Sequence, residues 1–102
     1  MRALRFTPEA SDDLERLVDH IVERELKSST SNWDLPEQAL SAIRMALQLL
    51  PSNPFMGRKV RSPFERELII SFGRTGYVAL YEVEDTAITV AAIRHQRESD
   101  YH

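Results

Sequence analysis

The sequence has no cysteine, only three glycines among 102 residues, and no long hydrophobic run. The absence of cysteine excludes disulfide bonds, thiolate-ligated zinc and a thiol nucleophile. No apolar stretch approaches the roughly 20 residues that span a bilayer, so no membrane association is expected. The N-terminus also lacks the apolar core of a signal peptide. We therefore expect a single cytoplasmic domain that covers residues 1–102.

Lysine is also scarce, because Lys27 and Lys59 are its only occurrences, and the formal net charge is −3. A negative net charge argues against bulk electrostatic binding of nucleic acid, which needs a positive surface potential. Residues 1–57 carry six basic and nine acidic residues, whereas residues 58–102 carry seven of each. The acid excess thus belongs to the N-terminal half, and the C-terminal half can still hold a local basic site.

The first quarter of the chain has the pattern of a short strand followed by an amphipathic helix. Residues 3–6 form a brief apolar run that suits a strand. Thr7 and Pro8 then supply an N-cap hydroxyl and a proline at the first helical position. Apolar residues recur from there at spacings of three and four, which predicts a helix that ends near Leu26 or Lys27.

A second amphipathic helix follows a polar loop at residues 28–32. Pro36 marks its start, and Pro51 prevents it from continuing. Two such helices joined by a short polar loop form an antiparallel hairpin. The apolar stripes of that hairpin need another layer to cover them.

The C-terminal half predicts that layer as a small antiparallel sheet. Runs rich in β-forming residues lie at 66–72, 77–83 and 88–94, separated by short turn sequences. A shorter strand is expected around residues 59–61. The expected fold class is therefore α+β, with the helical hairpin packed on an antiparallel sheet.

Two-residue turns at residues 74–75 and 85–86 would assign every strand residue to one face of this sheet. One face is then almost wholly apolar and should cover the helices. The other mixes apolar and polar groups, so it faces either water or a partner. This register places Arg94 on the apolar face and His95 on the open face. A one-residue slip would exchange the faces of a strand.

Basic and aromatic groups gather where these strands end, and binding groups concentrate at such positions. Converging guanidinium groups can hold phosphate or carboxylate through paired hydrogen bonds, although an ordinary surface ion pair is the alternative for each arginine. His95 and Tyr101 are candidate proton carriers, and His95 is alternatively a structural hydrogen-bonding residue. No metal or other cofactor is expected, because no histidine pair has ligand spacing. The candidates for phosphate or partner binding are Arg58, Arg61, Arg66, Arg94 and Arg97.

Short motifs in a fixed order extend over nearly the whole chain. They are Phe6-Thr7-Pro8-Glu9-Ala10, Leu50-Pro51-Ser52-Asn53-Pro54, Gly57-Arg58, Arg66-Glu67-Leu68 and Ile93-Arg94-His95-Gln96-Arg97. Together they resemble the RelE/ParE superfamily of bacterial toxins. The resemblance implies the same α+β fold, with the first strand joining the sheet. It also implies a type II toxin bound and neutralised by a cognate antitoxin, as in plasmid stabilisation systems.

Two activities divide this superfamily. RelE-like members cut messenger RNA on the ribosome, and ParE-like members lack that catalytic set and inhibit DNA gyrase. The motifs are more similar to ParE sequences, and the acidic net charge and scarce lysine agree with that branch. The alternatives are a ribosome-dependent endonuclease and a non-toxic relative kept for antitoxin binding. The endonuclease would use Arg66, Arg94, His95 and Tyr101.

An antitoxin segment that folds on binding needs apolar surface to offset the entropy that it loses. The open face of the predicted sheet offers such a surface, and the outer face of the helical hairpin is the alternative. The candidate contact residues on the open face are Ile69, Val78, Leu80 and Ile93.

Overall fold

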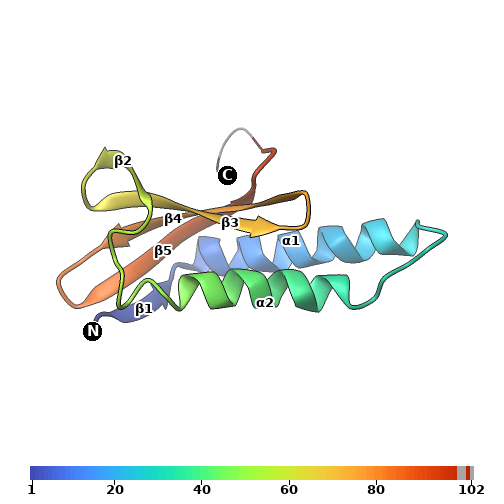
Figure 1. Ribbon diagram of the computed structural model, residues 1–102, viewed down its shortest axis with the longest axis horizontal. Helices are drawn as coiled ribbons and strands as arrows, with labels where there is room; N and C mark the ends of the chain where they lie inside the picture. The colour runs from blue at the N-terminus through green and yellow to red at the C-terminus, as the bar shows by residue number, and fades with distance from the viewer. Residues whose placement is uncertain (99–100, 102) are drawn as a thin grey trace.

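The chain folds as two helices that cover one face of a five-stranded sheet (Figure 1). The computed structural model describes residues 1–98 and 101. The sheet order is β1-β5-β4-β3-β2, and β1 pairs parallel to β5 while the other pairs are antiparallel. The elements are β1 Ala3–Phe6, α1 Pro8–Leu26, α2 Leu35–Leu47, β2 Arg58–Ser62, β3 Glu65–Phe72, β4 Thr75–Val83 and β5 Ala87–His95. The expected α+β class is confirmed, with a mixed rather than a purely antiparallel sheet.

Thr7 starts α1 and also fastens it to the sheet. Its side-chain oxygen accepts a hydrogen bond from the Ala10 amide at 3.1 Å, which is the predicted N-cap. The same hydroxyl donates to the Ala91 carbonyl of β5 at 2.8 Å. One side chain therefore sets both where the helix begins and where it lies on the sheet.

The core lies between the helices and the sheet face that they cover. Leu and Ile side chains from the helices interlock there with aromatic and branched side chains from the strands. Burial of each such side chain stabilises the fold by roughly 1.5–3 kcal/mol. The core includes Leu17, Ile21, Ile43, Leu47, Leu68, Ile70, Tyr77, Tyr81, Ile88, Val90 and Ile93.

The β3–β4 turn lies one residue earlier than predicted. Phe72 pairs with Thr75, so the two-residue loop consists of Gly73 and Arg74. Gly73 has a φ of 60°, the left-handed conformation that the first loop residue of a type II′ turn needs. The pairing of the two strands moves by two residues as a result. A shift of two keeps every side chain on its predicted face.

A β-bulge in β5 overturns the prediction for the end of that strand. Tyr81 pairs with Val90, but the preceding Leu80 pairs with Ala92, so Ala91 is an extra residue. Because side chains alternate along a strand, one extra residue exchanges the two faces from there onward. The two consecutive alanines suit either face, so the alternation of apolar and polar residues does not reveal the bulge.

The four residues after the bulge, Ala92 to His95, consequently lie on the faces opposite to those predicted. Ile93 is fully buried in the core instead of lining the open face. His95 pairs with Tyr77 on the helix side of the sheet. Arg94 pairs with Val78 and lies on the face away from the helices, which we call the open face.

Helix α1 replaces β1 as the neighbour of β5 where β1 ends. The Thr7 amide donates to the Val90 carbonyl at 3.0 Å, which is the last main-chain bond from this side. Asp13 is 8% exposed, and its Oδ2 accepts the Ile93 amide at 2.9 Å. The other carboxylate oxygen lies 3.7 Å from the Arg16 guanidinium. A side-chain carboxylate thus satisfies a buried main-chain amide that no strand reaches.

Replacement of Asp13 by alanine should lower the free energy of unfolding by about 1–3 kcal/mol, because the buried Ile93 amide loses its acceptor. Urea unfolding followed by circular dichroism measures this loss. Asp12→Ala is the matched control, since Asp12 is exposed on the same helix and should change stability by less than about 0.5 kcal/mol. Equal losses in the two variants would refute the role of Asp13.

Candidate functional site

Several of the predicted residues meet on the open face of the sheet. The Tyr101 hydroxyl donates to Glu67 Oε2 at 2.6 Å, and the Arg58 Nη2 atom lies 2.8 Å from Glu67 Oε1. The Arg94 guanidinium lies 5.1 Å from the centre of the Tyr101 ring. One carboxylate thus draws a guanidinium and a phenol together across the strands.

These contacts also set the protonation of the cluster. Burial is the largest cause that raises the pKa of the Tyr101 phenol above its ordinary value, and the hydrogen bond to Glu67 raises it further. Burial alone would raise the pKa of Glu67, but the Tyr101 hydroxyl and the Arg58 guanidinium outweigh it and lower that pKa. Glu67 is therefore ionised and Tyr101 protonated at neutral pH. A phenol already donating to a carboxylate is poorly placed to transfer its proton to a substrate.

Two more of the predicted arginines donate to main-chain carbonyls. Arg94 Nη1 donates to the Glu98 carbonyl at 2.6 Å, so it holds the C-terminal segment against the sheet. Arg66 donates to the carbonyls of Pro63 and Gly57, each at 2.7 Å. Both guanidinium groups therefore fasten a loop to a strand. Neither presents all its donors to an external anion.

The loop that Arg66 holds is also fastened from inside the core. The hydroxyl of the buried Tyr81 donates to the Pro54 carbonyl at 2.8 Å and accepts the Gly57 amide at 3.0 Å. A Cβ atom at position 57 would lie 2.6 Å from the Glu67 carbonyl oxygen, so a larger residue requires the strand to shift. The sequence motifs at residues 50–54 and 57–58 thus hold this loop against Tyr81 and β3, a role that the sequence alone did not reveal.

The remaining predicted arginines lie apart. Arg61 forms a two-pronged ion pair with Glu65, with N–O distances of 2.7 and 3.2 Å, at the solvent-exposed end of β2. Arg97 follows β5 and borders a groove next to α1. Arg58, Arg61, Arg66 and Arg94 are thus all engaged with oxygen atoms of the protein itself. Arg97 has no such side-chain contact among the described residues.

His95 lies on the helix side of the sheet, away from Tyr101. Its Nδ1 accepts the Arg97 amide at 3.1 Å, and its Nε2 lies 3.1 Å from the Thr75 hydroxyl. Because Nδ1 accepts, we assign the ring proton to Nε2, which donates it to Thr75. Burial is the largest cause that lowers the pKa of His95, and the Arg97 charge lowers it further. These contacts favour the structural alternative for this histidine.

The residues predicted to bind an antitoxin do not form one surface. Ile69 is 48% exposed on the open face, and Leu80 is half-buried. Val78 is only 2% exposed, and Ile93 lies in the core on the other side of the sheet. The prediction that Ile93 lies on the open face is wrong, because the β-bulge turns its side chain into the core.

An apolar groove that the sequence did not predict lies beside β1, which is an edge strand of the sheet. It has a volume of about 300 Å³ and runs between β1 and the two helices. Phe6, at its border, is 41% exposed. Within the part of the chain that the structure describes, β1 has a strand partner on one side only. Apolar side chains line the groove, namely Leu4, Phe6, Leu14, Leu40, Ile43 and Leu47.

Among residues 1–98 and 101, no group of three or more His, Asp or Glu side chains has an arrangement that could hold a metal ion. Neither helix in this part of the chain has the length and apolar character needed to cross a bilayer.

The chain is similar to known toxins over most of its length. The family described as "ParE toxin of type II toxin-antitoxin system, parDE" matches residues 4–100. Toxin RelE3 of Caulobacter vibrioides is 31% identical over 98 residues, which cover 96% of this chain and 98% of the relative. Toxin RelE1 of the same organism is 33% identical over 89 residues, which cover 87% of each chain.

A solved structure described as "Chromosomal ParDE TA system from P. aeruginosa" contains a chain of similar fold. The TM-score is 0.73 at 24% sequence identity, and the match covers 93% of this chain and 96% of the other. At this identity the likeness supports the fold alone, whereas the family match extends over almost every residue. The resemblance to the RelE/ParE superfamily is confirmed, and the chain belongs to the ParE toxin family of type II toxin–antitoxin systems.

Proposed function

We propose that this toxin binds DNA gyrase and inhibits it without catalysing a reaction of its own. The observation that carries the proposal is the state of the four residues that a ribonuclease would use. Arg66 and Arg94 donate to main-chain carbonyls, and Tyr101 donates to the ionised Glu67. His95 lies on the other side of the sheet with both ring nitrogens engaged.

Ribonuclease chemistry at this surface would need a proton carrier and cations that face the scissile phosphate together. Arg94 and His95 are neighbours in β5 and lie on opposite faces of the sheet, so the two cannot act on one phosphate. Glu67 would repel a phosphate that approached Arg58 or Tyr101. An acidic protein with internally engaged arginines is better suited to a protein target than to ribosomal RNA.

Cleavage of messenger RNA on the ribosome is the second candidate. The curated relatives are named Toxin RelE3 and Toxin RelE1, which favours it by name. It would require Tyr101 to leave Glu67 when RNA binds. The third candidate is a relative that binds its antitoxin but harms no target, and growth without arrest on induction would identify it.

For the partner that neutralises the toxin, we propose that the cognate antitoxin docks in the apolar groove beside β1. An ordering segment needs apolar contacts to offset its lost entropy, and this groove provides them. The unpaired edge of β1 can add main-chain hydrogen bonds to the same segment. Both toxin and antitoxin would act in the cytoplasm, where gyrase and ribosomes are found.

The gyrase proposal predicts inhibition of supercoiling by the purified toxin at micromolar excess, with accumulation of cleaved plasmid. A supercoiling assay on agarose gels measures both effects. A parallel translation reaction with ribosomes and a defined transcript should show no cleavage. Normal supercoiling together with transcript cleavage would reject gyrase and establish the second candidate.

Tyr101→Phe and His95→Gln should each still arrest growth on induction, because neither residue transfers a proton in the proposed mechanism. A ribonuclease would lose roughly 10²- to 10⁴-fold in rate on removal of its general acid or base. Growth curves and transcript patterns after induction provide the measurement. Circular dichroism of the purified variants separates loss of function from loss of fold. Survival of cells that express a folded Tyr101→Phe toxin would count against the gyrase proposal.

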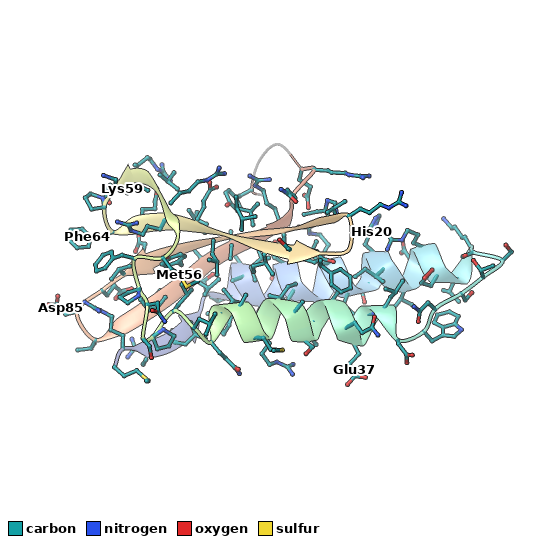
Figure 2. All side chains as sticks on the ribbon, viewed as in Figure 1. His20, Glu37, Met56, Lys59, Phe64 and Asp85 are labelled. Carbon is teal, nitrogen blue, oxygen red and sulfur yellow. The ribbon has the colours of Figure 1, made fainter. Side chains whose placement is uncertain are left out.

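The docking proposal predicts that Phe6→Ala weakens antitoxin binding by roughly 10-fold or more, as expected for an aromatic contact at an interface. Isothermal titration calorimetry with the cognate antitoxin measures the change. Phe64→Ala is the matched control, because Phe64 is 58% exposed near the β2–β3 turn (Figure 2). It should change the affinity by less than about 2-fold. A larger loss with Phe64→Ala would place the antitoxin elsewhere.

A further inference from the structure

A groove of about 780 Å³ lies between α1 and the turn that joins β3 to β4. Positively charged side chains come to it from three separate parts of the chain. Figure 2 shows His20 on α1 beside the end of the β3–β4 hairpin. The floor is apolar and includes Leu17, Ile21 and Tyr77. The basic lining residues are Arg16, His20, Arg24, Arg74 and Arg97.

The arginines of this groove differ from those of the open face in what they contact. Arg24, Arg74 and Arg97 have no side-chain hydrogen bond or ion pair with any residue in 1–98 or with residue 101. Arg16 is paired, with its Nη1 3.4 Å from Glu98 Oε1. The open face thus neutralises its cations internally, and this groove leaves three of them available.

The charges of these residues act within the same small volume. Burial is the largest cause that lowers the pKa of His95; the charges of Arg97, His20 and Arg24 lower it further, and the Glu98 charge opposes them. Their fields therefore overlap at the groove wall. Glu98 also lines the groove, where it pairs with Arg16. Keeping the remaining cations close together costs electrostatic free energy, and an anionic ligand would lower that cost.

Exposed carboxylates near the groove favour an acidic peptide over a nucleic acid as its ligand. Asp12, Asp19 and Glu23 are exposed on α1, next to the basic residues of the same helix. A nucleic acid carries a continuous line of phosphates and would be repelled where it passed these carboxylates. Separate carboxylates alternating with apolar side chains would match both the guanidinium groups and the floor.

We propose that this groove binds an acidic peptide segment of a partner protein, whose carboxylates contact Arg24, Arg74 and Arg97 while its apolar side chains rest on the floor. The Arg16–Glu98 ion pair closes one side of the site. This surface lies on the helix side of the sheet, and the proposal does not depend on gyrase being the target.

Fluorescence anisotropy with the full-length toxin tests the proposal. The probe is a labelled heptapeptide of alternating glutamate and leucine or phenylalanine. We expect saturable binding at 50 mM salt that weakens at 500 mM, because salt screens half-exposed charges. The double variant Arg24→Ala/Arg74→Ala should weaken binding by roughly 10-fold or more. The same peptide with glutamine in place of glutamate should bind more weakly by a similar factor.

The matched control is Arg5→Ala/Arg44→Ala, which removes two exposed arginines from β1 and α2. It should change the affinity by less than about 2-fold. Thermal unfolding of both double variants near the wild-type midpoint verifies that the fold is kept. No saturable binding below about 1 mM, or equal losses in the two double variants, would overturn the proposal. Tighter binding of a single-stranded oligonucleotide of equal charge would overturn it in favour of nucleic acid.

Discussion

The contact between the start of α1 and the end of β5 decides which side chains each face of the sheet presents. Thr7 donates to the carbonyl of the bulged Ala91, and two turns of helix later Asp13 accepts the Ile93 amide. Both bonds are made by side chains at a place where β1 no longer reaches β5. They satisfy main-chain groups that the bulge would otherwise leave buried and unpaired. The extra residue is therefore stabilised by the helix, and Arg94 is turned to the open face.

With Arg94 on the open face, the basic residues form two groups with different properties. On the open face, Arg58 pairs with Glu67, and Arg66 and Arg94 donate to main-chain carbonyls. On the helix side, Arg24 and Arg74 border a groove and have no such side-chain partners among the residues that the structure describes. The arginines that can contact an acidic partner protein are therefore those at the groove on the helix side. The gyrase proposal rests on the engaged arginines of the open face, and the acidic-segment proposal rests on the arginines that border the groove.

The family motifs have a largely structural explanation in this chain. Gly57 is small enough for the close approach of the Glu67 carbonyl, and Tyr81 binds the main chain on both sides of it. Arg66 closes the same loop from the solvent side. Residues that identify the family therefore hold the β2–β3 region in place. Their presence is therefore compatible with either gyrase inhibition or messenger RNA cleavage. The side chains around them distinguish between these two activities.

The sequence by itself determined the elements, because helix caps, apolar spacing and turn residues act over a few positions. Thr7 at the helix start, Gly73 in the turn and the alternation in β3 and β4 all depend on local geometry. Only the tertiary structure decided the directions of Ile93, Arg94 and His95, since the bulge before them is stabilised by Asp13, which is 80 positions away. It also decided which arginines find an internal oxygen. Whether an arginine reaches an oxygen on another strand depends on the distance between the two strands in space. The spacing of residues along the sequence does not give that distance.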